Sequence, residues 1–283
     1  MKITYLGTTV LLFDDGTDQI LFDCHTTRPS ILRFLFGKLA TDTAVADRVI
    51  AQFGFSRLRA TFCSHSHYDH VLDLQYYVNR CGGDVYGSPS ALNVARGGGV
   101  AEERLHDFTQ QPEARIGAFS VRVIPSKHSR AHFYNDDLGQ TIDRPLVQPA
   151  RKKQYREGGS FDFIVTHGDT TYVIRPSCNY IPGQLDGVRA DVLFLGVTGL
   201  SKESPAWQET FFSETIDKTR PRLVIPLHWD RFFAPLYGPV RGLPRLFEDT
   251  GASMKLLAER CAARGVDCLV RLPLTRKRMQ SCA

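Results

Sequence analysis

The chain has 283 residues, of which 42% are hydrophobic and 23% charged, which is typical of a globular protein with a buried core. No apolar run approaches the roughly 18 residues of a membrane-spanning helix, and Gly7, Thr8 and Thr9 interrupt the N-terminal stretch that could otherwise suggest a signal peptide. The net charge of +5 is mild for this length, so we expect no nucleic-acid partner.

The N-terminal segments predict short strands followed by helices. Apolar runs at 2–6, 9–13 and 19–23 are separated by turn residues and predict a meander of three strands. The next segment, 25–57, changes character and predicts two helices, the first of which we expect to pack over a cleft.

From residue 58 onward, predicted strands alternate with predicted helices. Strands are expected at 58–63, 83–88, 119–126, 190–197, 221–230 and 267–272, a hairpin at 161–177, and helices at 71–80, 90–98, 204–219 and within 244–263. The polar segment 129–160 predicts a lid or binding loop. We therefore expect one domain over residues 1–283, with sheets covered by helices and with insertions near 25–57 and 129–160 as the walls of the cleft.

The seven cysteines are scattered, odd in number and without a CxxC pair. Such usage does not describe a disulfide framework, so we expect free thiols and a cytoplasmic protein.

The stretch "SHSHYDH" places four ligand-type side chains directly after the predicted strand 58–63, namely His65, His67, Asp69 and His70. Neutral imidazole suits zinc, iron or manganese. One ion cannot easily take all four groups from so tight a loop, which indicates a pair of metal sites with further ligands elsewhere in the chain.

Three later residues complete the set. His128 follows the strand 119–126, Asp169 lies in the hairpin turn "HGDT", and His228 ends the strand "RLVIPL". His132 is an alternative to His128, which we favour because it follows its strand more directly.

These segments resemble the metallo-β-lactamase-fold superfamily. "SHSHYDH" is similar to its HxHxDH signature, and "PSKHS", "HGDT" and "IPLHWD" resemble its later ligand segments in the expected order. Within the superfamily, the chain is most similar to L-ascorbate-6-phosphate lactonase-like proteins and to N-acylphosphatidylethanolamine phospholipase D.

The resemblance implies an α/β protein with an αββα four-layer sandwich and two divalent metal ions, zinc first and manganese or iron as alternatives. It implies that His65, His67 and His128 hold one metal, that Asp69, His70 and His228 hold the other, and that Asp169 bridges them. Asp23 is expected to support one of the histidines from behind.

The expected activity is that of a metal-dependent hydrolase. A hydroxide bridging two metals would attack an ester, lactone or phosphodiester, with Asp69 handling the proton and Tyr180 directing its phenol at the cleft. The alternatives are a thioester hydrolase or sulfur dioxygenase-like enzyme, and a non-catalytic metal-binding sensor.

Two features bear on the substrate. Cys24 and His25 follow Asp23 and place a thiol and an imidazole near the predicted cleft. The basic stretches "RPSILRFLFGKLATD" and "ARKKQYR" favour a small-molecule substrate that is anionic or lipid-like.

Overall fold

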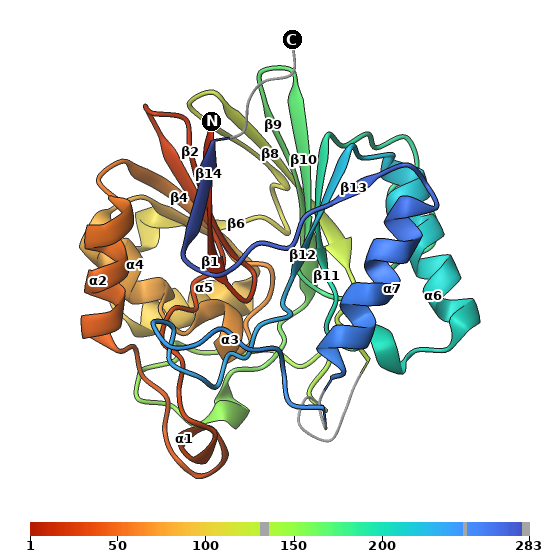
Figure 1. Cartoon of the computed structure of the whole chain (residues 1–283). Coiled ribbons are helices and arrows are strands. Elements are labelled where there is room, and N and C mark those ends of the chain that lie inside the picture. Colours follow the sequence, from red (N-terminus) through yellow and green to blue (C-terminus); the bar gives the residue numbers. More distant parts are fainter. Residues whose placement is uncertain (131–135, 246–247, 279–283) are drawn as a thin grey trace.

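The computed structural model describes residues 1–130, 136–245 and 248–278, and it contains two seven-stranded sheets packed face to face (Figure 1). The first sheet has the order β14 (Thr275–Arg278), β1 (Lys2–Gly7), β2 (Val10–Asp14), β3 (Gln19–Phe22), β4 (Leu58–Phe62), β5 (Asp84–Gly87) and β6 (Leu105–Asp107). The second has the order β13 (Asp267–Cys268), β12 (Leu223–Leu227), β11 (Val192–Gly196), β10 (Thr170–Arg175), β9 (Ser160–His167), β8 (Phe119–Ser126) and β7 (Glu113–Ile116).

Each sheet is antiparallel in one part and parallel in the other. The meander β1–β2–β3 is antiparallel and continues through parallel pairs from β3 to β6. In the second sheet β7 to β10 are antiparallel, and β10 to β13 are parallel. Parallel strands point their carboxyl ends toward the same sheet edge, which is where loops can gather ligands.

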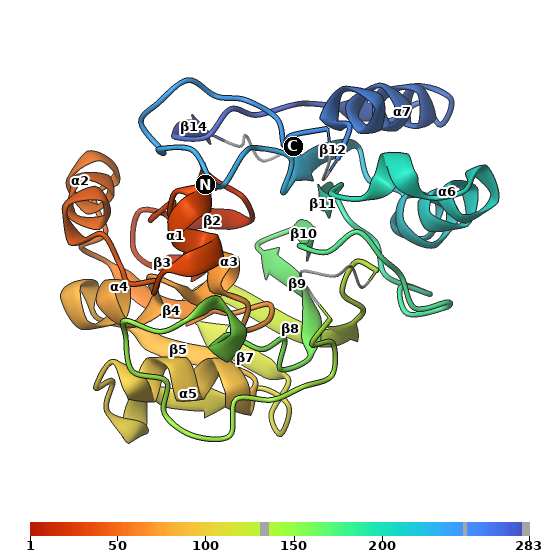
Figure 2. The ribbon, with the colours of Figure 1, turned by 90° about the horizontal axis from the view of Figure 1, so that it is seen from below.

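Helices cover the outer face of each sheet (Figure 2). On the first sheet these are α2 (Thr43–Phe53), α4 (Leu74–Cys81) and α5 (Pro89–Gly97). The short helices α1 (Ile31–Phe36) and α3 (Tyr68–Val71) lie at the lower end of the sandwich in Figure 1. On the second sheet they are α6 (Pro205–Phe212), which a π-helical turn at Ser213–Asp217 extends, and α7 (Thr250–Ala262). The expected αββα four-layer sandwich is therefore confirmed.

An aromatic core fills the space between the two sheets. Phe13 and Phe22 of the first sheet contact Tyr172 and Phe163 of the second, with ring centroids 5.2 Å and 5.1 Å apart. Aromatic side chains bury large apolar areas, so this layer holds the two sheets together and fixes their relative position.

Helix α2 shows how local sequence sets an element. Asp42 caps its N-terminus by accepting a hydrogen bond from the Val45 amide, and Gly54 ends it in the left-handed region at φ 68°. Its buried face, which includes Val49 and Phe53, packs onto the first sheet's outer layer.

The C-terminal end differs from the sequence prediction. The strand expected at 267–272 is reduced to β13, and the basic segment Thr275–Arg278 forms β14 against β1. The Arg271 guanidinium donates to the carbonyl oxygens of Ile3 and Thr275, so a polar bridge to the other sheet replaces strand pairing there.

Two further expectations concern the thiols and the membrane. The six cysteines within the described residues are free thiols. Among the described helices, none combines the length and the apolar character needed to cross a bilayer.

Candidate metal centre

The loop after β4 carries the densest group of ligand-type side chains. His65 and His67 lie in this loop, and Asp69 and His70 lie in the short helix α3, which begins directly after His67. All four residues are buried. The strand therefore delivers the segment to the edge of the sandwich, and the helical turn directs the second pair toward a neighbouring position.

Three imidazoles form the first ligand group. The ligand atoms of His65, His67 and His128 lie within 4.8 Å of one another, and His67 Nδ1 is 3.2 Å from His128 Nε2. His65 Nε2 is buried without a hydrogen-bond partner. An orphaned imidazole nitrogen facing two others is costly in a protein interior unless an ion completes it.

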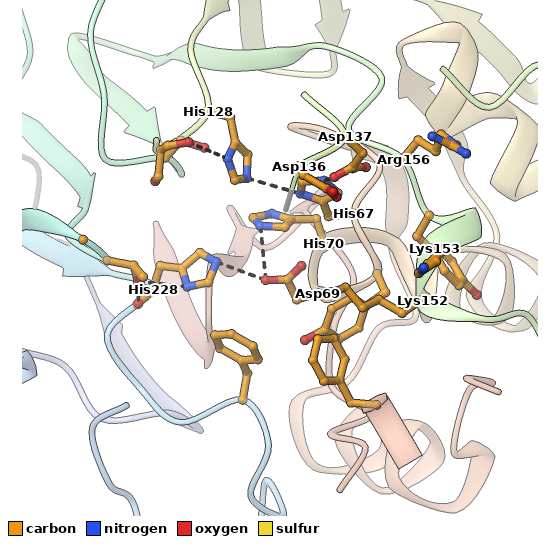
Figure 3. A pocket seen from close by; sticks show the side chains of 18 of the residues that line it. His67, Asp69, His70, His128, Asp136, Asp137, Lys152, Lys153, Arg156 and His228 are labelled. Atoms are coloured by element: carbon orange, nitrogen blue, oxygen red, sulfur yellow. Dashed lines mark hydrogen bonds and ion pairs between the residues drawn. The ribbon is translucent and has the colours of Figure 1, made fainter. Parts of the chain in front are cut away.

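The second group combines a carboxylate with two imidazoles (Figure 3). The ligand atoms of Asp69, His70 and His228 also lie within 4.8 Å of one another. Asp69 Oδ2 is 3.3 Å from His228 Nε2 and 3.9 Å from His70 Nε2. The ring centroids of His65 and His70 are 3.7 Å apart, so the two groups are adjacent.

Each of the five histidines has a polar partner for its other ring nitrogen. His70 Nδ1 is 2.8 Å from Asp23, and His67 Nε2 is 3.2 Å from both oxygens of Asp137. The remaining contacts are His65 Nδ1 to Ser64 Oγ at 3.2 Å, His128 Nδ1 to the Ser129 carbonyl at 3.0 Å, and His228 Nδ1 to Thr198 Oγ1 at 3.2 Å. Such partners fix the ring orientation and the tautomer, as metal-binding histidines require, so the donor set fits two metal ions.

Burial sets the protonation of His65 and His128 in the first group. Burial, together with His70, lowers the pKa of His65 well below its usual value. Burial, together with His67, lowers the pKa of His128 to about 3. Both imidazoles are therefore neutral near pH 7, which is the form that binds metals.

The second group is polarised. Burial tends to raise the pKa of Asp69, but His70 and His228 outweigh it and hold this pKa well below its usual value. Burial lowers the pKa of His228, but its contact with Asp69 outweighs this and raises it. A negative charge is thus favoured beside the position that a cation would take.

The prediction for Asp169 is wrong. Asp169 lies in the turn between β9 and β10, where His167 pairs with Thr170 and contacts Asp15 at 3.2 Å. β9 runs antiparallel to β8, so this turn lies beside the start of β8, whereas His128 follows its end. The turn is therefore at the opposite end of the strands from the ligand groups. Ser177, which follows β10, lines the cavity at the ligand end instead.

The prediction for Tyr180 is also wrong. Its ring packs against Trp207 and Phe211 of α6, with centroids 5.4 Å and 6.5 Å away, and it is not among the residues that line the cavity. The apolar side chains of α6 draw the ring away from the cleft. The alternative ligand His132 lies outside the described residues.

Asp137 is a functional candidate that sequence reasoning missed. It follows a polar stretch without periodicity, and no motif distinguishes it from Asp136. Its carboxylate reaches His67 only because the segment folds back over the loop after β4, where Asp137 also accepts from the Glu157 amide at 3.1 Å.

The two residues after Asp23 are buried beside the centre. Cys24 is fully buried, and burial raises the pKa of its thiol well above the usual value. His25 packs edge-on against Tyr68, and burial lowers its pKa to about 3. Both side chains are therefore neutral and support the floor of the centre.

A cavity of about 410 Å³ opens above the ligands. One wall carries the cations Lys152, Lys153 and Arg156, with Asp136 and Asp137 beside them (Figure 3). The adjoining wall is apolar and consists of Phe34, Tyr68, Phe232, Phe233 and Leu243. A group with negative charge and an apolar body matches these walls.

Comparison with known proteins agrees with the fold. Solved structures with similar folds include the metallo-beta-lactamase fold protein YhfI from Bacillus subtilis, with a TM-score of 0.56, 15% identity and 98% and 99% of the two chains covered. The metallo hydrolase Igni18 from Ignicoccus hospitalis has a TM-score of 0.57 and 12% identity, with 99% of both chains covered. The short form of human tRNase Z has a TM-score of 0.56 and 13% identity, with 99% of this chain and 100% of that chain covered.

No curated protein matches the sequence significantly. A family model, described as the beta-lactamase superfamily domain, matches residues 18–229, which include every described ligand of both groups. The chain therefore belongs to the beta-lactamase superfamily, and its αββα sandwich is the metallo-β-lactamase fold.

Proposed function

We propose that this chain is a dinuclear metal-dependent hydrolase that cleaves an ester, lactone or phosphodiester carrying an anionic group next to an apolar body. The observation that carries the proposal is the pair of adjacent ligand groups at the floor of a cavity with one basic and one apolar wall. His65, His67 and His128 would hold one ion, and Asp69, His70 and His228 the other.

The metals, once bound, supply Lewis acidity and lower the pKa of coordinated water. Five imidazoles and one carboxylate favour zinc, or iron, over manganese, which prefers oxygen ligands. Ser177, and not a carboxylate, follows β10 at the ligand end of the sandwich. Asp69 is therefore the one negatively charged side chain in the two ligand groups.

The chain's own residues would position the substrate and the water. Asp69, kept ionised by its two histidines, accepts a hydrogen bond and orients the attacking water toward the substrate. Lys152 holds its ammonium 4.7 Å above the Phe34 ring, at the boundary between the basic and apolar walls. A phosphate or carboxylate of the substrate would pair with it there.

Turnover tests the proposal. Protein stripped by a chelator and reloaded with zinc, iron or manganese is offered bis(p-nitrophenyl) phosphate, an aryl ester, a lactone and a thioester. Metal-dependent hydrolysis of an oxygen ester that His65→Ala abolishes supports the proposal. Full metal occupancy with no turnover of any probe identifies a binding protein instead, and a dominant thioester activity identifies the alternative enzyme class.

Charge substitution tests the substrate class separately. Lys152→Met should lower kcat/KM for the anionic phosphodiester by about tenfold or more, since a partly buried charged hydrogen bond is lost, and should spare the neutral ester. The control is Lys255→Met on α7, whose exposed ammonium lies on a different element. Equal losses on both probes would show that Lys152 serves structure and not recognition.

A further inference from the structure

An apolar and basic surface surrounds the mouth of the cavity. Three large side chains of α1 point into solvent, with Leu32 67% exposed, Leu35 57% and Phe36 76%. They lie at i, i+3 and i+4 and so share one face of the helix, while Phe34 on the other face lines the cavity. We call this exposed face the α1 face.

A second segment extends the surface. Leu39 and Ala150 exchange backbone hydrogen bonds of 2.7 Å and 3.0 Å, which join residues 28–41 to residues 144–156. Val147 of the second segment is 65% exposed. Figure 2, seen from below, shows α1 and the segment around 152–154 on the same side of the molecule.

The charge of the two segments is predominantly positive, with exposed Asp42 and Asp143 directly beside them. Residues 28–41 and 144–156 contain eight lysines and arginines and no aspartate or glutamate. Arg28 is buried in an ion pair with Asp230 at 2.6 Å, but Arg33, Lys38, Arg144, Arg151 and Lys153 are exposed. The two segments together carry +8 and the whole chain +5, so the rest of the chain carries a net charge of −3.

Exposed leucine and phenylalanine side chains with lysines and arginines nearby are typical of a helix that lies in the interface of a membrane. Apolar side chains enter the acyl boundary of a bilayer, and lysines and arginines meet the lipid headgroups. An RNA partner would use the cations, but it would gain nothing from aliphatic Leu32 and Leu35. The apolar half of the surface therefore discriminates between the two partners.

We propose that the α1 face docks this protein on an anionic phospholipid surface and places the mouth of the cavity against it. Phe34 then connects the docked helix to the apolar wall, and Lys152 and Lys153 connect the headgroup region to the basic wall. Docking is measured by binding alone, so it stands or falls independently of the proposed hydrolysis.

Vesicle flotation of the full chain tests this. The protein should float with phosphatidylcholine vesicles that contain phosphatidylserine, and much less with phosphatidylcholine alone or at high salt. The triple variant Leu32→Gln, Leu35→Gln, Phe36→Gln should bind about 1,000-fold more weakly, because each of the three buried side chains contributes roughly one decade of affinity. These residues are exposed, so glutamine should preserve the fold.

The control is Val270→Gln with Leu272→Gln, which removes two apolar side chains of 46% and 52% exposure between β13 and β14. It should float like the wild type, as should His65→Ala. Undiminished flotation of the triple variant, or no flotation of the wild type, would overturn the proposal. Tight binding of a labelled RNA hairpin that the triple variant retains, without flotation, would assign the basic surface to nucleic acid.

Discussion

The Asp23 carboxylate lies 2.8 Å from Nδ1 of His70, with both side chains withdrawn from solvent. The same carboxylate accepts hydrogen bonds from Thr9 Oγ1 and from the amide and hydroxyl of Ser64. Asp23 thus ties together the ends of three segments and orients Nε2 of His70 toward Asp69. It does this from a left-handed backbone at φ 53°, a conformation that asparagine also tolerates.

We expect Asp23→Asn to fold and to bind the second metal about 10- to 100-fold more weakly, because the His70 ring loses its charged partner. Chelator competition measures this affinity. The matched control is Asp84→Asn, which breaks a half-exposed carboxylate–histidine pair with His106 at 3.0 Å. An Asp23→Asn protein with unchanged affinity would show that Thr9 and Ser64 suffice to orient the ring.

His65→Ala and Asp169→Ala should differ in metal content. The first variant removes a ligand whose Nε2 faces two other imidazoles, so the purified protein should carry less metal. The second alters a turn at the opposite end of β9 and should retain the full content. Elemental analysis of both proteins checks this, and a deficit in Asp169→Ala would contradict the placement of that turn.

Asp137→Asn should weaken metal binding at the first group by less than Asp23→Asn weakens the second. Its contact with His67 is longer, at 3.2 Å, and Asp137 is partly exposed, so water can replace part of the interaction. Asp136→Asn is the control, since the Asp136 carboxylate is next to Asp137 in the chain and also lines the cavity. Identical losses in the two variants would indicate a general effect of negative charge.

The contribution of Asp162 to stability should fall between about pH 4 and pH 6. Burial outweighs the attraction of Arg175, 3.3 Å away, and raises the pKa of Asp162 to about 6. A raised carboxyl pKa means that the folded state holds the proton longer than the unfolded state. The contribution is therefore complete below pH 4 and is lost as the pH rises through 6, at a cost of about 3 kcal/mol.

Urea unfolding at pH 4.5 and at pH 7 measures this loss. Asp162→Asn cannot ionise, so its free energy of unfolding should lack this part of the pH dependence even if the unpaired Arg175 lowers its overall stability. A variant with the same pH slope as the wild type would assign the dependence to other groups.

Six of the seven residues that the sequence proposes as ligands lie together in the two groups, because each follows a strand. β4, β8 and β12 end at the same edge of the sandwich, and His65, His128 and His228 come next in the chain. The carboxyl ends of these strands meet at this edge, so residues that directly follow the strands are expected to lie close together.

The same reasoning failed for Asp169 because the motif "HGDT" was matched without following strand direction. A hairpin turn lies at the end where its first strand stops, and β9 starts at the ligand end, since Ser160 pairs with Ser126. Tyr180 failed for another reason: its partners on α6 lie more than 25 positions later in the chain, and packing across that separation has no local signal. Asp137 belongs to the same class of long-range contact.

His228 comes from the second sheet, but its amide donates to the Thr8 carbonyl in the first, at 2.6 Å, and it adopts φ 60° there. Two residues on, Asp230 accepts from the Thr8 amide and the Tyr5 hydroxyl. Because four of the six grouped ligands come from the first half of the sandwich and His128 and His228 from the second, a chain divided between the sheets would yield two fragments that each lack part of both coordination sets. The proposed metal centre thus lies at the interface between the two sheets. A substitution that weakens this interface would impair metal retention without changing a ligand.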